Sequence, residues 1–156
     1  MSQVGKISFA FVGLVLGFVP CTRGQEKHIK KSDLPPAVQK TTAQQSVDAT
    51  VRGYTQEMEN GRLEYEIEMT VNGRSKDVSI DPTGKVLETE EGVTLGELPQ
   101  PVRAALQKKA GAAKIEKIES ITKQGKLVAY EAHILAGAQK SELQVGPGGE
   151  QLDHEE

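Results

Sequence analysis

The sequence predicts an α+β fold of two tandem units, each a short helix packed on one face of a four-stranded antiparallel meander. Three observations support this prediction. Stretches of alternating apolar and polar residues are separated by Asn-Gly or other glycine-containing turns, which is the pattern of β-hairpins. A helix-forming stretch that begins with Leu-Pro precedes each set of strands. These landmarks recur in the same order, which indicates an internal duplication.

The first 24 residues have the form of a secretory signal peptide. A positively charged start containing Lys6 is followed by the apolar run 7–19 and by small residues up to Gly24. The apolar run is shorter than the roughly 20 residues that a transmembrane helix needs. We therefore expect a secreted or periplasmic localisation and no membrane span, with residues 25–33 forming a flexible N-terminus.

Cys21 is the only cysteine, so no intramolecular disulfide can form. It lies where a bacterial lipoprotein carries its lipidated cysteine. Pro20 fits poorly next to such a cleavage site, and we expect Cys21 to leave with the signal peptide. A lipid anchor at Cys21 is the alternative.

The charge of the chain excludes one class of partner. Removal of Lys6 and Arg23 with the signal peptide takes the formal net charge from −3 to about −5. Proteins that bind nucleic acid carry basic patches, because contacts to phosphate dominate their affinity. We therefore expect no nucleic-acid partner.

The first unit spans residues 34–90. Residues 34–46 form the expected helix, with two prolines in its first turn. Turns at Asn60-Gly61, Asn72-Gly73 and Asp81-Pro82-Thr83-Gly84 separate four strands, and Gly53 is a candidate β-bulge. A two-residue turn at Asn72-Gly73 pairs Val71 with Arg74, Ile67 with Val78, and Tyr65 with Ile80. The large apolar residues then lie opposite one another on one face of the sheet.

The second unit spans residues 98–153, after a linker at 91–97. Its landmarks match the first unit at a shift of 64 or 65 residues: Leu34-Pro35 with Leu98-Pro99, Tyr65-Glu66 with Tyr130-Glu131, Pro82 with Pro147, and Gly84 with Gly149. Residues 99–110 form the expected helix. Thr94 and Glu97 have the spacing of a capping box, and Gly111 ends the helix. A hairpin turn at Gly137-Ala138 sets Tyr130 opposite Val145.

Leu-Pro-x-x-Val, followed by Gly-Lys/Arg-Leu, Tyr-Glu and Asp-Pro-x-Gly-Lys-Val-Leu, resembles the PepSY-like domains, which are also described as similar to the beta-lactamase inhibitor fold. The resemblance covers nearly the whole predicted mature chain, twice, over residues 34–90 and 98–153. It implies exported proteins, often tandem, with helices on one face of an antiparallel sheet. The activities that it implies are inhibition or regulation of peptidases and protein binding in the cell envelope. It implies no catalytic residues.

Few residues have the pattern of a reactive site. The three histidines are His28, His133 and His154, and none has the spacing of a metal site. His133 is expected on the outer strand face beside Glu131, as an ordinary surface histidine. No serine lies in a nucleophile elbow, and the glycines at 146–149 are turn residues. We therefore expect no enzyme activity, no catalytic residue, no cofactor and no metal.

The open face of the sheet is the expected contact surface. Glu64, Glu66 and Glu68 form an acidic row there, which is either a solvated face or a strip that recognises a basic partner. The equivalent face of the second unit is less charged. The candidate partner surface comprises Glu64, Glu66, Glu68, Ala129, Glu131, His133 and Leu135.

We expect a non-catalytic module that binds a protein or peptide of unknown identity through this face. The alternatives are a regulator or inhibitor of an extracytoplasmic peptidase and a lipid-anchored structural protein of the envelope. Strong interfaces depend on Trp, Tyr and Arg anchors, and the predicted mature chain has no Trp or Phe. Weak binding is therefore expected more than potent inhibition.

Overall fold

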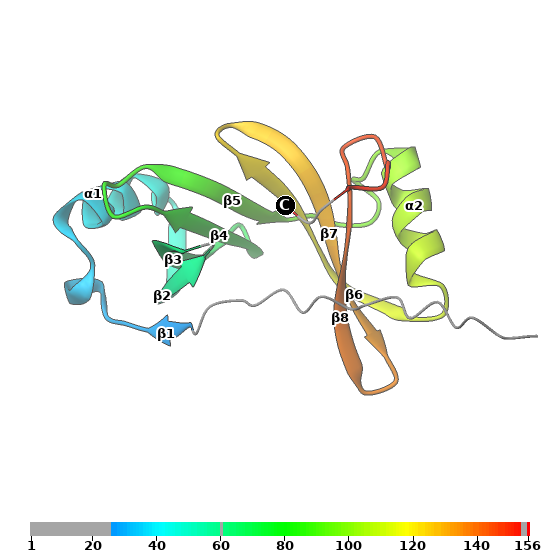
Figure 1. Cartoon of the computed structure of the whole chain (residues 1–156), viewed down its shortest axis with the longest axis horizontal. Helices are drawn as coiled ribbons and strands as arrows, with labels where there is room; N and C mark the ends of the chain where they lie inside the picture. The colour runs from blue at the N-terminus through cyan, green and yellow to red at the C-terminus, as the bar shows by residue number, and fades with distance from the viewer. Residues whose placement is uncertain (1–25, 60, 154–155) are drawn as a thin grey trace, which may run out of the picture.

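The structure is a computed structural model that describes residues 26–59, 61–153 and 156. Within these residues the chain forms one antiparallel sheet of eight strands in the order β1 to β8 (Figure 1). The elements are β1 (Lys27–His28), a 3-10 helix η1 (Lys31–Asp33), α1 (Pro36–Gln45), β2 (Ala49–Glu59), β3 (Arg62–Val71), β4 (Arg74–Ile80), β5 (Val86–Gly92), α2 (Gln100–Ala110), β6 (Lys114–Lys123), β7 (Lys126–Ala136) and β8 (Gln139–Val145). The predicted signal peptide, with Cys21, lies outside the described residues, as does His154.

The prediction of two tandem helix-plus-meander units is wrong. β5 pairs with β6 from Glu88–Lys123 to Gly92–Glu119, so one continuous sheet crosses the expected boundary. The predicted linker at 91–97 begins inside β5, and only three strands follow α2. The last strand of a meander leaves a row of unpaired backbone groups, and here β6 pairs with that edge. The chain is predominantly β, and the internal duplication stays a prediction from the sequence.

The hairpin registers are confirmed. Tyr65 lies opposite Ile80 across β3 and β4, and Tyr130 lies opposite Val145 across β7 and β8. The pairing of β2 with β3 shifts between Val51 and Gly53, which is the expected bulge. Alternation of apolar and polar residues therefore determined which side chains share a face, because a slip of one residue would exchange the two faces.

Both helices cover the same face of the sheet. The row Met69, Lys76, Glu91, Ser120, Tyr130 and Val145 runs across β3 to β8 through successive strand pairs. Met69 belongs to the core cluster beneath α1, and Val145 belongs to the cluster beneath α2. The two helices therefore lie over opposite ends of one apolar face (Figure 1). We use the term open face for the other side of the sheet.

Each helix packs through a narrow apolar stripe. Val38 of α1 is fully buried with Ile67 and Ile80, and Val102 and Leu106 of α2 are fully buried in the second cluster. Each such side chain contributes about 1.5–3 kcal/mol through removal of apolar surface from water. Because the clusters are separate, the middle of the sheet has no helix over it.

A glycine turn contacts the start of each helix. Gly84 follows β4 with φ +88, and a Cβ there would lie 2.8 Å from the carbonyl oxygen of Ala37. Gly149 follows β8 with φ +85, and a Cβ there would lie 2.6 Å from the carbonyl oxygen of Pro101. Both positions therefore combine a left-handed backbone with a close backbone contact that only glycine allows.

Thr94 and Glu97, which were expected to cap the second helix, stabilise a turn before it instead. The Thr94 backbone N–H donates to Glu97 Oε2 at 2.8 Å and the Thr94 hydroxyl donates to the same oxygen at 2.7 Å. These bonds stabilise a turn before α2, which begins only at Gln100, after Pro99. They lower the pKa of Glu97 to about 2, assisted by Arg74. Gly111 ends α2 as expected, with φ +57.

Candidate functional site

The open face of the sheet is rich in carboxyl groups. The strand pairing places eleven of them there: Glu57, Glu59, Glu64, Glu66, Glu68, Asp77, Glu88, Glu90, Glu119, Glu131 and Glu142. The basic residues that lie on the same face or contact its acids are Arg52, Arg62, Lys117, Lys123, Lys126, His133 and Lys140. The excess of acids over bases makes this face the most distinctive surface of the described chain.

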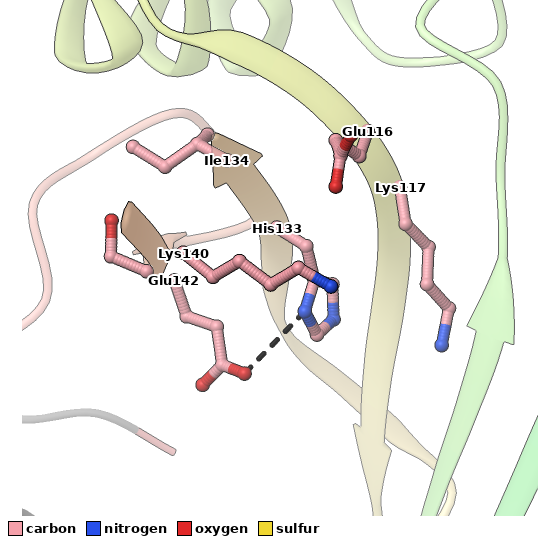
Figure 2. A pocket seen from close by; sticks show the side chains of 7 residues that line it. Glu116, Lys117, His133, Ile134, Lys140 and Glu142 are labelled. Carbon is pink, nitrogen blue, oxygen red and sulfur yellow. Dashed lines mark ion pairs between the residues drawn. The ribbon is translucent and has the colours of Figure 1, made fainter. Parts of the chain in front are cut away.

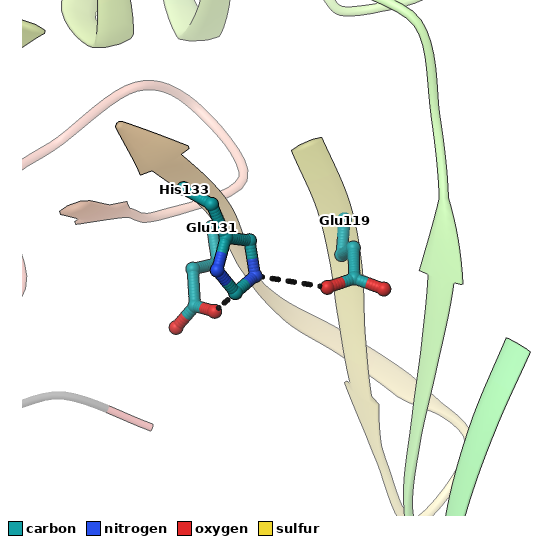
Figure 3. A group of neighbouring side chains, drawn as sticks. All are labelled: Glu119, Glu131 and His133. Atoms are coloured by element: carbon teal, nitrogen blue, oxygen red, sulfur yellow. Dashed lines mark hydrogen bonds and ion pairs between the residues drawn. The ribbon is translucent and has the colours of Figure 1, made fainter. Parts of the chain in front are cut away.

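Glu119 lies beside His133 on the neighbouring strand (Figure 3) and is 1% exposed. Its carboxylate accepts from Lys117 Nζ at 2.6 Å, His133 Nε2 at 3.1 Å and Ser75 Oγ at 3.1 Å. Burial alone would raise the pKa of Glu119, but the hydrogen bonds from His133, Lys117 and Ser75 outweigh it, so the pKa is lowered. Glu119 is therefore a buried anion held by three donors.

Gly92 makes the bond from Ser75 possible. Gly92 lies opposite Glu119 in β5, and a Cβ on it would lie 2.7 Å from Ser75 Oγ. The missing side chain leaves a path across β5, through which a serine of β4 reaches a glutamate of β6. The cluster is thus assembled across the boundary that the sequence prediction placed between two units.

His133 is surrounded by carboxylates. Its Nε2 also lies 3.2 Å from Glu131 Oε1, and its Nδ1 lies 3.4 Å from Glu142 Oε1. Hydrogen bonds to Glu119 and Glu131 raise the pKa of His133 to about 10, against the opposing effect of burial. The ring is therefore an imidazolium cation at neutral pH, hydrogen-bonded through Nε2 and ion-paired through Nδ1 with Glu142. Gln144 Nε2 donates to the second oxygen of Glu131 at 2.7 Å.

Two opposed acids are bridged by an arginine. Glu68 and Asp77 face each other across β3 and β4, as the register predicted. Arg52 NH2 lies 3.0 Å from Asp77 Oδ1, and its NH1 lies 3.9 Å from Glu68 Oε2. The arginine comes from β2, where it adjoins the bulge, so the irregular strand pairing places this cation over a repulsive pair.

Two other acids of the open face, Glu90 and Glu66, have raised pKa values. Burial, followed by the charge of Glu119, raises the pKa of Glu90 to about 9. Burial, followed by the charge of Asp77, raises the pKa of Glu66 to about 7. Glu90 is therefore neutral at pH 7, which limits the repulsion among these acids.

Two sets of these groups have ligand atoms close enough for a metal ion. They are Glu119, Glu131 and His133, and Asp77, Glu90 and Glu119, with the ligand atoms of each set within 4.8 Å of one another. A metal on the first set would require His133 to lose its proton. Lys117, Arg52 and protonated His133 already neutralise the buried carboxylates. The absence of a metal stays a prediction, and the geometry accounts for the cluster with its own cations.

A shallow groove of about 490 Å³ adjoins the cluster (Figure 2). It is lined by residues of β6, β7 and β8. Lys117, His133 and Glu142 join the groove to the open face. The other residues that line it are Glu116, Ile134, Lys140 and Ser141. The groove therefore lies at the edge of the sheet and has mixed charge.

The structure brings the candidate surface residues together, but they are less exposed than predicted. Glu64, Ala129 and Glu131 are buried, whereas Glu66, Glu68, His133 and Leu135 are half-buried. Of the predicted acidic row, Glu64 is therefore not freely solvated, whereas Glu66 and Glu68 keep partial contact with solvent. His133 lies beside Glu131 as expected, but it is a cluster member and not an ordinary surface histidine.

Sequence reasoning missed Glu119, Lys117 and Arg52 as parts of the site. Glu119 belongs to an alternating segment in which Ile118 and Ile121 are also buried, so the pattern alone does not identify a buried acid. The signal that could have found it is the pair of glutamates at 119 and 131, which face each other across the β6–β7 hairpin.

We expect the protein to be most stable near pH 5. The pKa values of Glu66 and Glu90 are raised to about 7 and about 9, so their contribution is lost as the pH rises from about 4.5 through these values; the pKa of Asp77 is also raised by burial, and its contribution is lost in the same direction. The contribution of His133 is present below pH 6.5 and is lost as the pH rises through about 10. Below about pH 4.5, protonation of groups such as Glu119 destabilises the fold. Thermal denaturation followed by circular dichroism at a series of pH values measures this profile.

Replacement of Glu90 by glutamine is the control for that profile. Glutamine keeps residue 90 in the neutral state that the folded protein prefers. The decline of the melting temperature between pH 5 and pH 9 should therefore become shallower. A melting temperature that rises steadily from pH 5 to pH 9 in the native protein would show that these acids are not buried.

Comparison with solved structures identifies the class of fold. The chain is similar to a BLIP-like protein of Bacteroides fragilis (20% identity, 76% of this chain and 83% of that chain, TM-score 0.57). It is also similar to a DUF2874 family protein of Bacteroides ovatus (21% identity, 78% and 86%, TM-score 0.60). A third similar structure, from Bacteroides eggerthii, is of a protein taken to be periplasmic (16% identity, 75% and 84%, TM-score 0.61). The chain therefore has a BLIP-like fold.

The beta-lactamase-inhibitor part of the predicted resemblance is thus confirmed for the fold, whereas membership of the PepSY-like domains stays a prediction. No family model matches the chain, and no curated protein matches it at a significant level. The periplasmic neighbour agrees with the predicted secreted or periplasmic localisation. Among the described residues, no helix has the length and apolar character needed to cross a membrane.

Proposed function

We propose that this chain is a non-catalytic, extracytoplasmic module that binds a basic segment of a protein or peptide through the open face of its sheet. The observation that carries the proposal is the collection of eleven carboxyl groups on the helix-free side. A solvated sheet face needs no such excess of one charge, whereas complementary potentials steer and orient a partner.

The outer part of this face suits such a partner better than its centre. Around Glu119 the buried acids are matched by Lys117, Arg52 and His133, so little net charge is left there. Glu66 and Glu68 lie at half-buried positions towards β2. A lysine or arginine side chain of the partner can pair with Glu66, whereas at Glu68 it competes with Arg52, whose NH1 lies 3.9 Å from the carboxylate.

The described surface favours modest affinity over potent inhibition. Tyr65 is buried, and Tyr54 and Tyr130 pack partly buried against the two cores. No tyrosine among the described residues is therefore an exposed anchor, and strong interfaces depend on such anchors. The name of the BLIP-like neighbour does not alter this preference, because a shared fold does not imply a shared function.

We expect a lysine-rich peptide to bind the purified protein, and a glutamate-rich peptide of equal length not to bind. The double variant Glu66→Gln/Glu68→Gln should weaken binding by about tenfold, because each charged contact contributes up to about 1 kcal/mol at an exposed site. Binding of the native protein should strengthen from pH 6 to pH 8 as Glu66, whose pKa is about 7, loses its proton. Isothermal titration calorimetry measures both effects.

Glu91→Gln is the matched control, because Glu91 is an exposed acid on the opposite side of the same sheet. It should leave the affinity unchanged. Equal affinities for the two peptides, or equal weakening by the control, would exclude the open face as the binding surface.

A further inference from the structure

Among the described residues, β8 is the last strand of the sheet and pairs only with β7. Its first four residues, from Gln139 to Glu142, are all exposed. The opposite edge differs, because the short strand β1 covers the middle of β2. The edge of β8 thus offers a segment of extended backbone that another strand could pair with.

The hairpin turn determines which backbone groups face outward. Ala136 and Gln139 close a two-residue loop, and such a closing pair exchanges hydrogen bonds within the hairpin. The N–H and C=O groups of Lys140, Glu142 and Gln144 therefore point away from β7. Lys109 Nζ confirms this phase, since it donates to the carbonyl oxygen of Gln144 at 3.0 Å. Lys109 thereby caps the far end of the edge, and the groups of Lys140 and Glu142 lie nearer the hairpin loop.

We infer that β8 pairs antiparallel with β8 of a second copy of this chain, in a register centred on Ser141. In that register Lys140 faces Glu142 of the other copy, twice by symmetry. The outward-facing backbone groups of these residues also meet, so each such pair can exchange two hydrogen bonds. Centring on Glu142 instead would place two glutamates opposite each other, which is destabilising. Charge and backbone phase thus select the same register.

The pairing is isologous and closes with two copies, because each β8 edge is used once. Four backbone hydrogen bonds and two ion pairs make a small interface, so the dimer should be weak, with a dissociation constant in the range of about 1 μM to 1 mM. The open faces of the two copies then form one surface across sixteen strands, the eight of each copy. This dimer does not depend on the proposed binding of a basic segment.

Charge exchange tests the register. Lys140→Glu places acids against acids and Glu142→Lys places bases against bases, so each variant alone should be monomeric in analytical ultracentrifugation. An equimolar mixture should form a heterodimer, because the introduced glutamate of one variant then faces the introduced lysine of the other. The double variant should dimerise like the native protein. Circular dichroism checks that each variant is folded, which matters for Glu142→Lys because Glu142 contacts His133.

Cysteine pairing tests the geometry without relying on charge. Ser141→Cys, in a Cys21→Ser background, should form a disulfide between copies, because a non-hydrogen-bonded pair on the two-fold axis has Cα atoms about 4.5 Å apart. Gln139→Cys should not, since the two residues would lie about 14 Å apart. A native protein that stays monomeric at about 1 mM, or equal cross-linking at both positions, overturns the inference.

Discussion

Replacing Glu119 by glutamine is expected to lower the free energy of unfolding by about 2–3 kcal/mol. The carboxylate is buried and accepts hydrogen bonds from Lys117, His133 and Ser75. Glutamine has nearly the same shape, but it removes the negative charge that balances two cations and turns one acceptor into a donor. Because Lys117 and His133 are partly exposed, water recovers some of the loss, and the effect stays below that of a fully buried pair. Urea denaturation measures the difference.

Glu116→Gln is the matched control for this variant. Glu116 lies in the same strand on an exposed position, where its contact is with Lys114. Exposed ion pairs contribute at most about 1 kcal/mol, and we expect a change below that value. If the two substitutions had the same small effect, Glu119 would not be the buried centre of the cluster.

Replacing Gly149 by alanine is expected to destabilise the fold by about 3 kcal/mol, as the sum of a backbone cost and a steric cost. The residue has φ +85, which costs roughly 1–2 kcal/mol for a residue with a Cβ. The new methyl group would also lie 2.6 Å from the carbonyl oxygen of Pro101, so the start of α2 must move. Loss of packing between α2 and the end of β8 adds to the cost. Thermal and urea denaturation both report this change.

Gly125→Ala separates the two causes. Gly125 has φ +77, but a Cβ there meets nothing within 4 Å. Alanine at this position should cost only the backbone term, about 1–2 kcal/mol. Similar losses at positions 125 and 149 would mean that the turn after β8 does not press against α2.

The hairpins were predictable because their signals are local. Asn72-Gly73 adopts positive φ at both residues, as a two-residue turn requires, and alternation then aligned Ile67 with Val78. The pairing of β5 with β6 was not predictable in the same way. A full helix lies between these strands, and no turn motif indicates which free edge a strand will meet. Local patterns therefore described each hairpin correctly and still led to the wrong fold class.

The candidate site also has a part that local patterns predict and a part that depends on distant strands. Glu66, Glu68 and His133 were recognised because alternation places them opposite the core. Their environment was not, because it depends on residues of other strands. Arg52 reaches Asp77 across β3 from a bulged strand, and Ser75 reaches Glu119 over Gly92. Such contacts arise only when the strands are assembled into one sheet, so the partners of a surface histidine could not be read from its neighbours in sequence.

The central feature of the site is a helix-free face whose buried carboxylates hold a protonated histidine. NMR titration of the His133 ring, with its nitrogens labelled, measures this directly. His133 is expected to stay an imidazolium at pH 8, because its carboxylate partners raise its pKa to about 10. A pKa close to 6.5, like that of an isolated histidine, would contradict it.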